Sequence, residues 1–315
     1  MPTGAASSVG LVTIRPVAAA APLTPLLTGP RIAGSVLAVF AAAAVIGVDT
    51  TAGSRIVALL AAEGSGVPNG VRLPLSTLDR PFAGVHPGAP VTVGARDIVT
   101  GTEHYRLART WRTAVPVIRP CRRALAVLAD RLIDAEIGVP QPRVRALEAG
   151  LTTGEPRAAV RGLVGLGRGL TPGGDDVLAG TMVGLRAVGR TVLLQQVRRA
   201  VGADVADRTT AISVDLLRLA ATGQAGLESL AVLGAIHAAQ RSSCGSGRLD
   251  ALTAAIDKLL AIGHTSGADL ATGLLIGLRT GAPDRPLPAA DPAVAVEAAA
   301  TQAAAQVAAL GQVLR

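Results

Sequence analysis

The chain has 315 residues, half of them hydrophobic and 17% charged, so it is long enough for two domains and too apolar to be intrinsically disordered. Its net charge is +8, but the basic residues are nearly all arginines, and most of them are scattered along the chain. A nucleic-acid-binding protein would cluster them, often beside aromatic side chains, which make up only 1% here. We therefore expect no nucleic-acid partner. A small anionic substrate would suit a basic chain better.

The cysteine content and the apolar segments indicate a cytoplasmic protein without a membrane anchor. Cys121 and Cys244 lie far apart and in no metal-binding spacing, which fits a reducing compartment. No basic region precedes an apolar run at the N-terminus, so we expect no signal peptide. The uncharged segment 32–48 is shorter than the roughly 20 residues that a membrane-spanning helix needs. We interpret it as a pair of buried strands, with a membrane helix as the alternative.

The first part of the chain has the pattern of a β-rich domain. Residues 1–30 predict a loosely ordered lead-in with one strand near Val9–Ile14. Between residues 31 and 115, short apolar runs alternate with turn signals, which predicts an antiparallel sheet or a small barrel. Its strands are expected at Ser35–Phe40, Ala44–Val48, Arg55–Leu60, Val91–Val93, Asp97–Val99 and His104–Leu107.

Pro116 and Pro120 mark the change to a helical pattern, which continues over residues 116–315. The expected fold class is therefore α+β: an N-terminal antiparallel β domain followed by a mostly α-helical C-terminal domain. Besides the two helices of the repeat described below, helices are expected at Arg122–Ile137, Val144–Gly150, Arg157–Leu166, Val192–Val201, Thr209–Ala221, Gly226–Gln240, Asp250–Ile262 and Pro292–Leu314.

A glycine-rich loop followed by an apolar helix occurs twice in the helical part. The first motif, residues 165–176, reads GLGRGLTPGGDD, and the second, residues 263–269, reads GHTSGAD. Each acidic end is followed by glycines at four-residue spacing, which places them on one helix face. These sets are Asp176, Gly180 and Gly184, and Asp269, Gly273 and Gly277. Small residues on a helix face allow two helices to approach closely. We expect the helices to cross about a local pseudo-two-fold axis, with both loops and both acidic residues at one end.

The glycine-rich loops predict a binding site for a small anion. Glycines permit left-handed backbone and close approach, and the first turn of a helix offers free N–H groups. The candidate substrate-binding residues are Gly167, Gly169, Thr171, Gly173, Gly174, Gly263, Thr265, Ser266, Gly267 and Asp269. The alternative is structural: a tight turn between helices, with Asp175 or Asp176 as a cap and Ser266 and Asp269 as a capping box.

Asp176, Asp175 and His264 are the candidate catalytic residues. The two aspartates could hold Mg²⁺ together with a phosphate, or they could orient an ammonium or amide group of the substrate. Neighbouring residues on a helix point in different directions, so we expect only one carboxylate, Asp176, to reach the ligand. His264 is a candidate proton carrier, with a backbone-bonded loop histidine as the alternative. Thr210 and Ser213 share a helix face and could bind an acceptor oxygen.

The two motifs resemble the family that contains the AllH subunit of oxamate carbamoyltransferase. The resemblance covers the helical half, including Thr209–Ser213, and extends more weakly to Trp111. It implies a role in purine and allantoin breakdown, in which oxalurate and phosphate give oxamate and carbamoyl phosphate. The transferase of that family contains more than one kind of subunit, so other protein subunits are expected as partners. The alternative is a non-catalytic metabolite-binding or scaffold subunit of another pathway.

Overall fold

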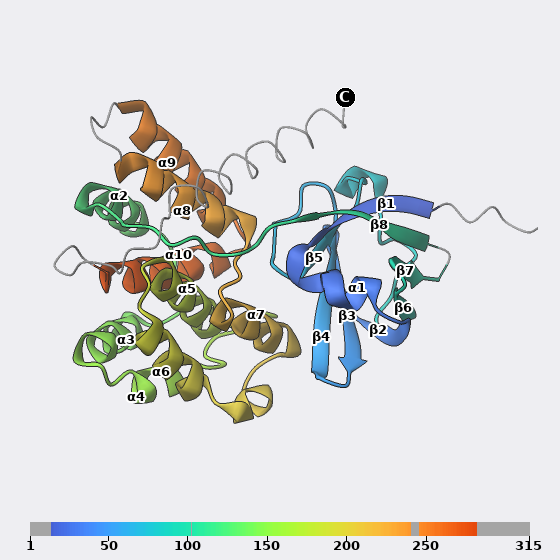
Figure 1. The fold of residues 1–315 in the computed structure, drawn as a ribbon, viewed down its shortest axis with the longest axis horizontal. Coiled ribbons are helices and arrows are strands. Elements are labelled where there is room, and N and C mark those ends of the chain that lie inside the picture. Colours follow the sequence, from blue (N-terminus) through green and yellow to red (C-terminus); the bar gives the residue numbers. More distant parts are fainter. Residues whose placement is uncertain (1–13, 102, 241–245, 282–315) are drawn as a thin grey trace, which may run out of the picture. The chain divides into compact units, whose positions relative to one another are not determined.

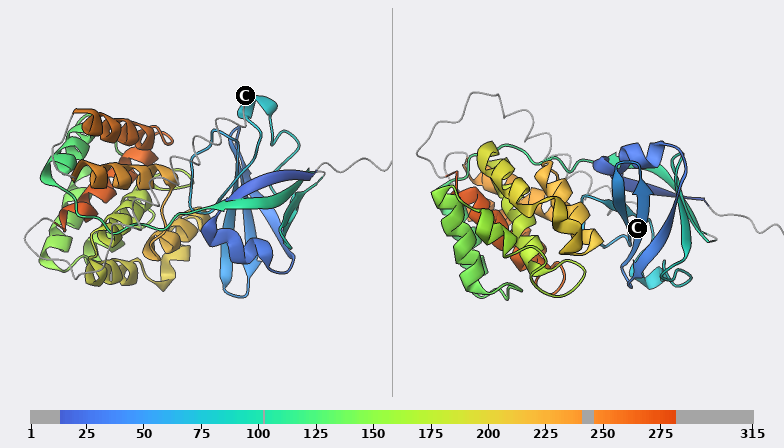
Figure 2. Two further views of the ribbon diagram at one scale, coloured as in Figure 1. Left: turned by 45° about the horizontal axis from the view of Figure 1, so that its top comes forward. Right: turned by 90° about the horizontal axis from the view of Figure 1, so that it is seen from below.

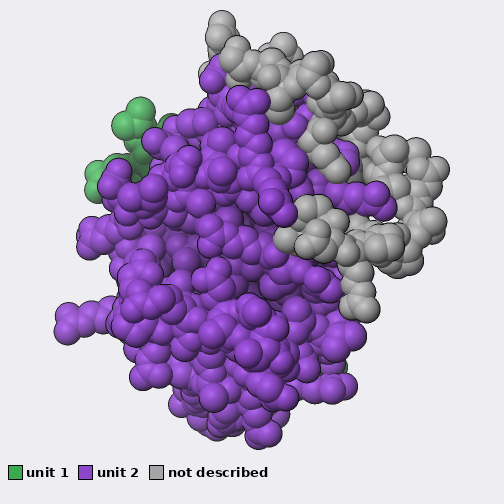
Figure 3. Space-filling model, turned by 90° about the vertical axis from the view of Figure 1, so that its left-hand side faces the viewer, with its two compact units in different colours: residues 1–19, 23–64, 70–110 green, residues 20–22, 65–69, 111–315 purple. Residues whose placement is uncertain are grey.

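The computed structural model describes residues 14–101, 103–240 and 246–281. These residues divide into two compact units (Figure 3). The barrel unit contains the described residues up to Ala19 together with residues 23–64 and 70–110. The helical unit contains residues 20–22, residues 65–69 and the described residues from Trp111 onward. Residues 65–69 thus lie between two barrel strands in the sequence but belong to the helical unit.

The barrel unit is a closed barrel with the strand order β1-β5-β4-β3-β2-β6-β7-β8 (Figure 1). A short helix, α1 (Thr24–Thr28), follows the first strand. Val57, Tyr105 and other buried side chains fill the barrel interior. The strands are β1 (Ile14–Ala20), β2 (Ile32–Val39), β3 (Ala43–Thr50), β4 (Gly53–Leu60), β5 (Gly70–Arg72), β6 (Pro90–Gly94), β7 (Asp97–Thr100) and β8 (Glu103–Trp111).

The expected antiparallel β domain is wrong, although the order of a β-rich half before a helical half is right. Strands β4 and β5 pair in parallel, with Ala58 opposite Gly70 and Leu60 opposite Arg72. A parallel pair cannot be closed by a tight turn and needs a crossover connection. Residues 61–69 make that crossover, and part of it is held in the helical unit. The sequence Pro68-Asn69-Gly70 is typical of a turn, so the three-residue strand β5, which begins at Gly70, was not expected.

Residues 14–28, which fall within the expected loosely ordered lead-in, form β1 and α1. Val17 and Leu27 from this segment are buried in the barrel core. Most of the strand expected near Val9–Ile14 lies outside the described residues. The uncharged segment 32–48 contains β2 and most of β3, so the interpretation as two strands is confirmed. Within the described ranges, no helix is both long enough and apolar enough to cross a membrane.

The helical unit is arranged around α5 (Gly173–Ala187), in which every residue except Arg186 is buried. The other helices are α2 (Arg122–Leu132), α3 (Gln141–Thr153), α4 (Arg157–Arg161), α6 (Thr191–Val201), α7 (Ala211–Ala221), α8 (Leu227–Gln240), α9 (Ser246–Leu260) and α10 (Ser266–Arg279). They occupy the positions that the apolar periodicity predicts, with shifted ends. The helix expected at Pro292–Leu314 lies outside the described residues.

Helices α5 and α10 lie side by side and in close contact (Figures 1 and 2). A Cβ atom on Gly180 would lie 2.1 Å from the carbonyl oxygen of Leu270, and one on Gly273 would lie 1.9 Å from that of Val177. The repeat aligns Gly180 with Gly273 and Val177 with Leu270, so each helix makes the same contact with the other. The expected crossing through the glycine faces, about a pseudo-two-fold axis, is therefore confirmed.

Candidate functional site

The α5–α10 crossing brings the two loops together at one end of the helix pair. The Thr171 Oγ1 and Ser266 Oγ atoms are 3.2 Å apart. Each helix start is closed by a backbone hydrogen bond: the Gly174 N–H donates to Leu166 O at 2.8 Å, and the Gly267 N–H donates to Ile262 O at 3.0 Å. The equivalent glycines of the repeat are thus both donors, to acceptors eight and five residues earlier in the chain.

These turns leave few backbone donors for an anion. Besides Gly174 and Gly267, the Asp175 N–H donates to Pro172 O at 2.8 Å and the Asp269 N–H donates to Thr265 O at 2.9 Å. Donors that are satisfied within the protein contribute little to an open anion cradle. We therefore see the first turns of α5 and α10 mainly as well-closed helix starts.

The remaining candidate residues of the loops lie in different surroundings. Gly167 and Gly169 lie exposed at the tip of the first loop, with φ of +120° and +97°, so that glycine is favoured at both positions. Gly263 has a φ of +59°, and His264 beside it is exposed. Gly173 is buried, and a Cβ atom there would lie 2.7 Å from Asp269 Oδ2.

Three buried carboxylates lie near the loops, and two of them hold the backbone in place. Asp175 Oδ1 accepts the Gly165 N–H at 2.9 Å, and its Oδ2 accepts the Thr209 hydroxyl. Both oxygens of Asp269 accept the Gly138 N–H, at 3.0 and 3.1 Å. Asp176 differs, because its Oδ2 is buried without a hydrogen-bond partner. The residue is only 5% exposed, so bulk water cannot replace the missing hydrogen bond to this oxygen.

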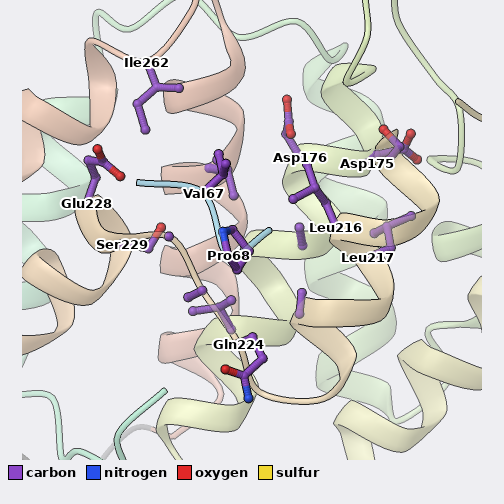
Figure 4. A pocket seen from close by; sticks show the side chains of 17 residues that line it. Val67, Pro68, Asp175, Asp176, Leu216, Leu217, Gln224, Glu228, Ser229 and Ile262 are labelled. Atoms are coloured by element: carbon purple, nitrogen blue, oxygen red, sulfur yellow. The ribbon is translucent and has the colours of Figure 1, made fainter. Parts of the chain in front are cut away.

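Asp176 lines a cavity of about 80 Å³ within the helical unit (Figure 4). The lining is mostly apolar, with side chains from α5, α7 and α10. The polar residues that line it are Asp175, Asp176, Ser213, Gln224, Glu228 and Ser229. None of the described lining residues is an arginine, a lysine or a histidine, and His264 is not among them. Electrostatically, the cavity favours a hydrogen-bond donor or a cation over an anion.

One wall of the cavity comes from residues 65–69. In Figure 4, Val67 and Pro68 lie between Asp176 on one side of the cavity and Glu228 and Ser229 on the other. The segment is fixed at Gly66, whose N–H donates to Glu228 Oε1 at 3.0 Å and whose carbonyl accepts the Leu227 N–H at 2.9 Å. The sequence gives no signal for this wall, because turn-like residues between two strands do not indicate a contact with helices far along the chain.

Burial raises the pKa of Asp176 from 3.8 to about 7. The nearby hydroxyls of Ser266 and Thr171 oppose this rise, whereas the charges of Asp269 and Asp175 add to it. Burial also raises the pKa of Asp269, against the hydrogen bond from Gly138. Near neutral pH, Asp176 can therefore either accept a hydrogen bond from a ligand or hold a proton and release it.

The expected Mg²⁺ site between Asp175 and Asp176 does not fit the side chains present. Both oxygens of Asp175 already accept hydrogen bonds, from Gly165 and Thr209. In the ranges that the structure describes, no group of three or more histidine, cysteine, aspartate or glutamate residues could hold a metal ion. We therefore derive no step through a metal.

Comparison with known proteins connects this site to one family. No solved structure matches the chain. Residues 163–278 match the family model described as oxamate carbamoyltransferase subunit AllH. The matched part contains Asp176 and Ser213, whereas residues 65–69 of the cavity wall lie outside it. The resemblance suggested by the two motifs is therefore confirmed over residues 163–278, from the first motif to the last turn of α10: this part of the chain matches the AllH family.

Proposed function

We propose that this chain is a subunit of a carbamoyltransferase of the oxamate carbamoyltransferase type, and that the Asp176 cavity holds the carbamoyl end of the substrate. The observation that supports the proposal is the buried, unpartnered Oδ2 of Asp176, a residue that lines a cavity whose lining lies mostly in the family-matching part. A buried acceptor without a donor costs free energy until a ligand supplies one. The –NH₂ of a carbamoyl group is such a donor.

The family reaction assigns Asp176 a second task. When phosphate attacks the carbamoyl carbon of oxalurate, a C–O bond forms, the C–N bond to the oxamate half breaks, and the leaving nitrogen needs a proton. Burial raises the pKa of Asp176 to about 7, so the carboxyl can carry that proton at neutral pH. The glycine-rich loops would act by positioning this carboxyl, and the exposed His264 remains a candidate only for exchange with solvent.

The phosphate needs a site of its own, since none of the described residues that line the cavity is basic. We propose that a partner subunit supplies it and that the chain alone binds substrate without turnover. The same lack of a basic lining residue favours a second candidate, a non-catalytic metabolite-binding subunit. That candidate predicts ligand binding without turnover in any assembly.

The experiment compares the chain alone with its complex with the other subunits, given oxamate and carbamoyl phosphate, and follows phosphate release. We expect turnover only in the complex. Asp176→Asn should lower kcat/KM of the complex by about 100-fold or more, as expected when a proton-transfer group is lost. The matched control is Asp257→Asn, an exposed aspartate of α9 that pairs with Arg131. Full activity of the Asp176→Asn complex would contradict the proposed site, and binding without turnover in every combination would favour the second candidate.

A further inference from the structure

A larger cavity lies at the opposite end of the α5–α10 pair from the two glycine-rich loops. Its volume is about 480 Å³, against about 80 Å³ for the Asp176 cavity, and it falls in the range of about 300–1,000 Å³ that is usual for ligand pockets. The C-terminal parts of α3 and α10 line it, together with residues at the start of α6. Most of these lining residues lie outside the family match, so the match does not account for this cavity.

One of two arginines that line this cavity, Arg190, is positioned to bind an oxyanion. Its side chain is half-buried, and its Nε donates to Thr280 O at 2.7 Å, which restricts the orientation of the guanidinium. Within the described ranges, no hydrogen bond or ion pair engages its two terminal nitrogens. A guanidinium held through Nε keeps two parallel N–H donors, the arrangement that matches a carboxylate or a phosphate.

The second arginine, Arg279, is held only weakly by its present partner. Its Nη1 atom lies 3.3 Å from Glu148 Oε1, and the two side chains are 48% and 43% exposed. Exposed pairs of this kind contribute little to stability, so an entering anion can replace Glu148 at small cost. The charged residues among the described lining are Glu148 and the two arginines, which leaves the cavity with a net positive charge.

The cavity also has an apolar side. Leu151 and Ile276, which are 3% and 4% exposed, line it together with Leu193. A ligand that covers these side chains gains from removing apolar surface from water. We propose that this cavity binds a metabolite with a carboxylate or phosphate on an apolar body, and that Arg190 and Arg279 hold the oxyanion.

This site is separate from the one in the proposed function. Asp176 lies in the first turn of α5, and the eleven residues from Asp176 to Ala187 rise by roughly 16 Å along the helix. A ligand at Arg190, beyond the end of α5, is too distant to react with a group at Asp176. The inference therefore concerns a second ligand, and it does not depend on the reaction or on the phosphate site assigned to a partner subunit.

The test measures binding of phenyl phosphate and benzoate to the full chain by calorimetry. Inorganic phosphate lacks the apolar body and benzyl alcohol lacks the charge, so these two probes serve as controls. We expect at least one of the aromatic anions, which then identifies the oxyanion, to bind about tenfold or more tightly than either control.

Two variants change the charges of the cavity in opposite directions. Arg190→Gln should weaken binding of the aromatic anion about tenfold or more, because two charge-assisted hydrogen bonds are lost. Glu148→Gln should strengthen it about two- to fivefold, because the competing carboxylate is gone. The matched control is Arg198→Gln, since this exposed arginine of α6 bonds to Gln195 and does not line the cavity.

Equal binding of all four probes, or binding of none, would overturn the inference. So would an unchanged anion affinity in Arg190→Gln or Glu148→Gln: an Arg190 that only caps α10 would lower the denaturation midpoint of its variant and leave binding as it was. Loss of anion binding in Asp176→Asn would place the anion at the other cavity and equally contradict the inference. Failure of the complex to turn over would count against the proposed function alone.

Discussion

At the residue scale, Asp175 and Asp176 are neighbours in the sequence with different environments. The sequence predicts that only one can reach a ligand, because successive helix residues point in different directions. It cannot predict the partners: Asp175 is bonded to Gly165 and Thr209, the second of which lies on a distant stretch of chain. Ser213 shows the same limit, since its helical face can be read from the sequence but its buried Oγ without a hydrogen-bond partner cannot.

The raised pKa of Asp176 predicts how stability depends on pH. The folded chain keeps this proton up to about pH 7, whereas the unfolded chain loses it near pH 3.8. The folded state binds more protons between these values, so the contribution of Asp176 to stability falls as pH rises from about 4 to 7. At pH 8, ionised Asp176 lowers the free energy of unfolding by on the order of 4 kcal/mol relative to its contribution at pH 4.

Asp176→Asn should therefore raise the free energy of unfolding by about 1–4 kcal/mol at pH 8 and change it little at pH 4. Guanidinium chloride unfolding at the two pH values measures the difference. Asp257→Asn serves again as the control, since this aspartate is exposed in the α9 surface pair. A variant less stable than wild type at pH 8 would show that Asp176 is ionised and stabilising in the folded chain.

At the scale of elements, the α5–α10 pair was the most predictable part of the molecule. Glycines at four-residue spacing on two apolar helices leave little choice but a close crossing, because only such a contact needs so many side-chain-free positions. The barrel was less predictable. Alternation and turns locate most strands, but the parallel β4–β5 pair depends on a crossover whose anchor, Glu228, is 162 positions from Gly66 in the sequence.

The close crossing makes a specific prediction for Gly273→Ala. The new Cβ atom would lie 1.9 Å from Val177 O, a backbone atom that cannot move without displacing α5. Overpacking of this kind costs about 1–3 kcal/mol or more, which outweighs the gain of up to about 1 kcal/mol that alanine brings to a helix. We expect a lower denaturation midpoint and weaker oxamate binding, because the helices that position Asp176 are forced apart.

The control for this variant is Gly247→Ala, at an exposed position of α9 where an added Cβ meets nothing within 4 Å. It should leave stability unchanged or raise it by a few tenths of a kcal/mol, following helix propensity alone. If Gly273→Ala behaved like Gly247→Ala in thermal unfolding, the tight α5–α10 contact would be incorrect.

At the scale of the whole molecule, both the Asp176 cavity and the family match lie in the helical unit. Residues 65–69, which lie between two barrel strands in the sequence, form one wall of that cavity. The sequence motifs predict backbone N–H groups for an anion at the starts of α5 and α10. The structure has closed turns there and a buried carboxylate among the residues that line a cavity, a difference that depends on tertiary contacts rather than on local pattern.

The most direct test of this account is a crystal structure of the chain, or of its complex, with bound oxalurate. The account predicts the terminal carbamoyl group in the Asp176 cavity, with its nitrogen within about 3.2 Å of Asp176 Oδ2. Oxalurate bound elsewhere on the molecule, with ordered water alone against Asp176, would contradict it.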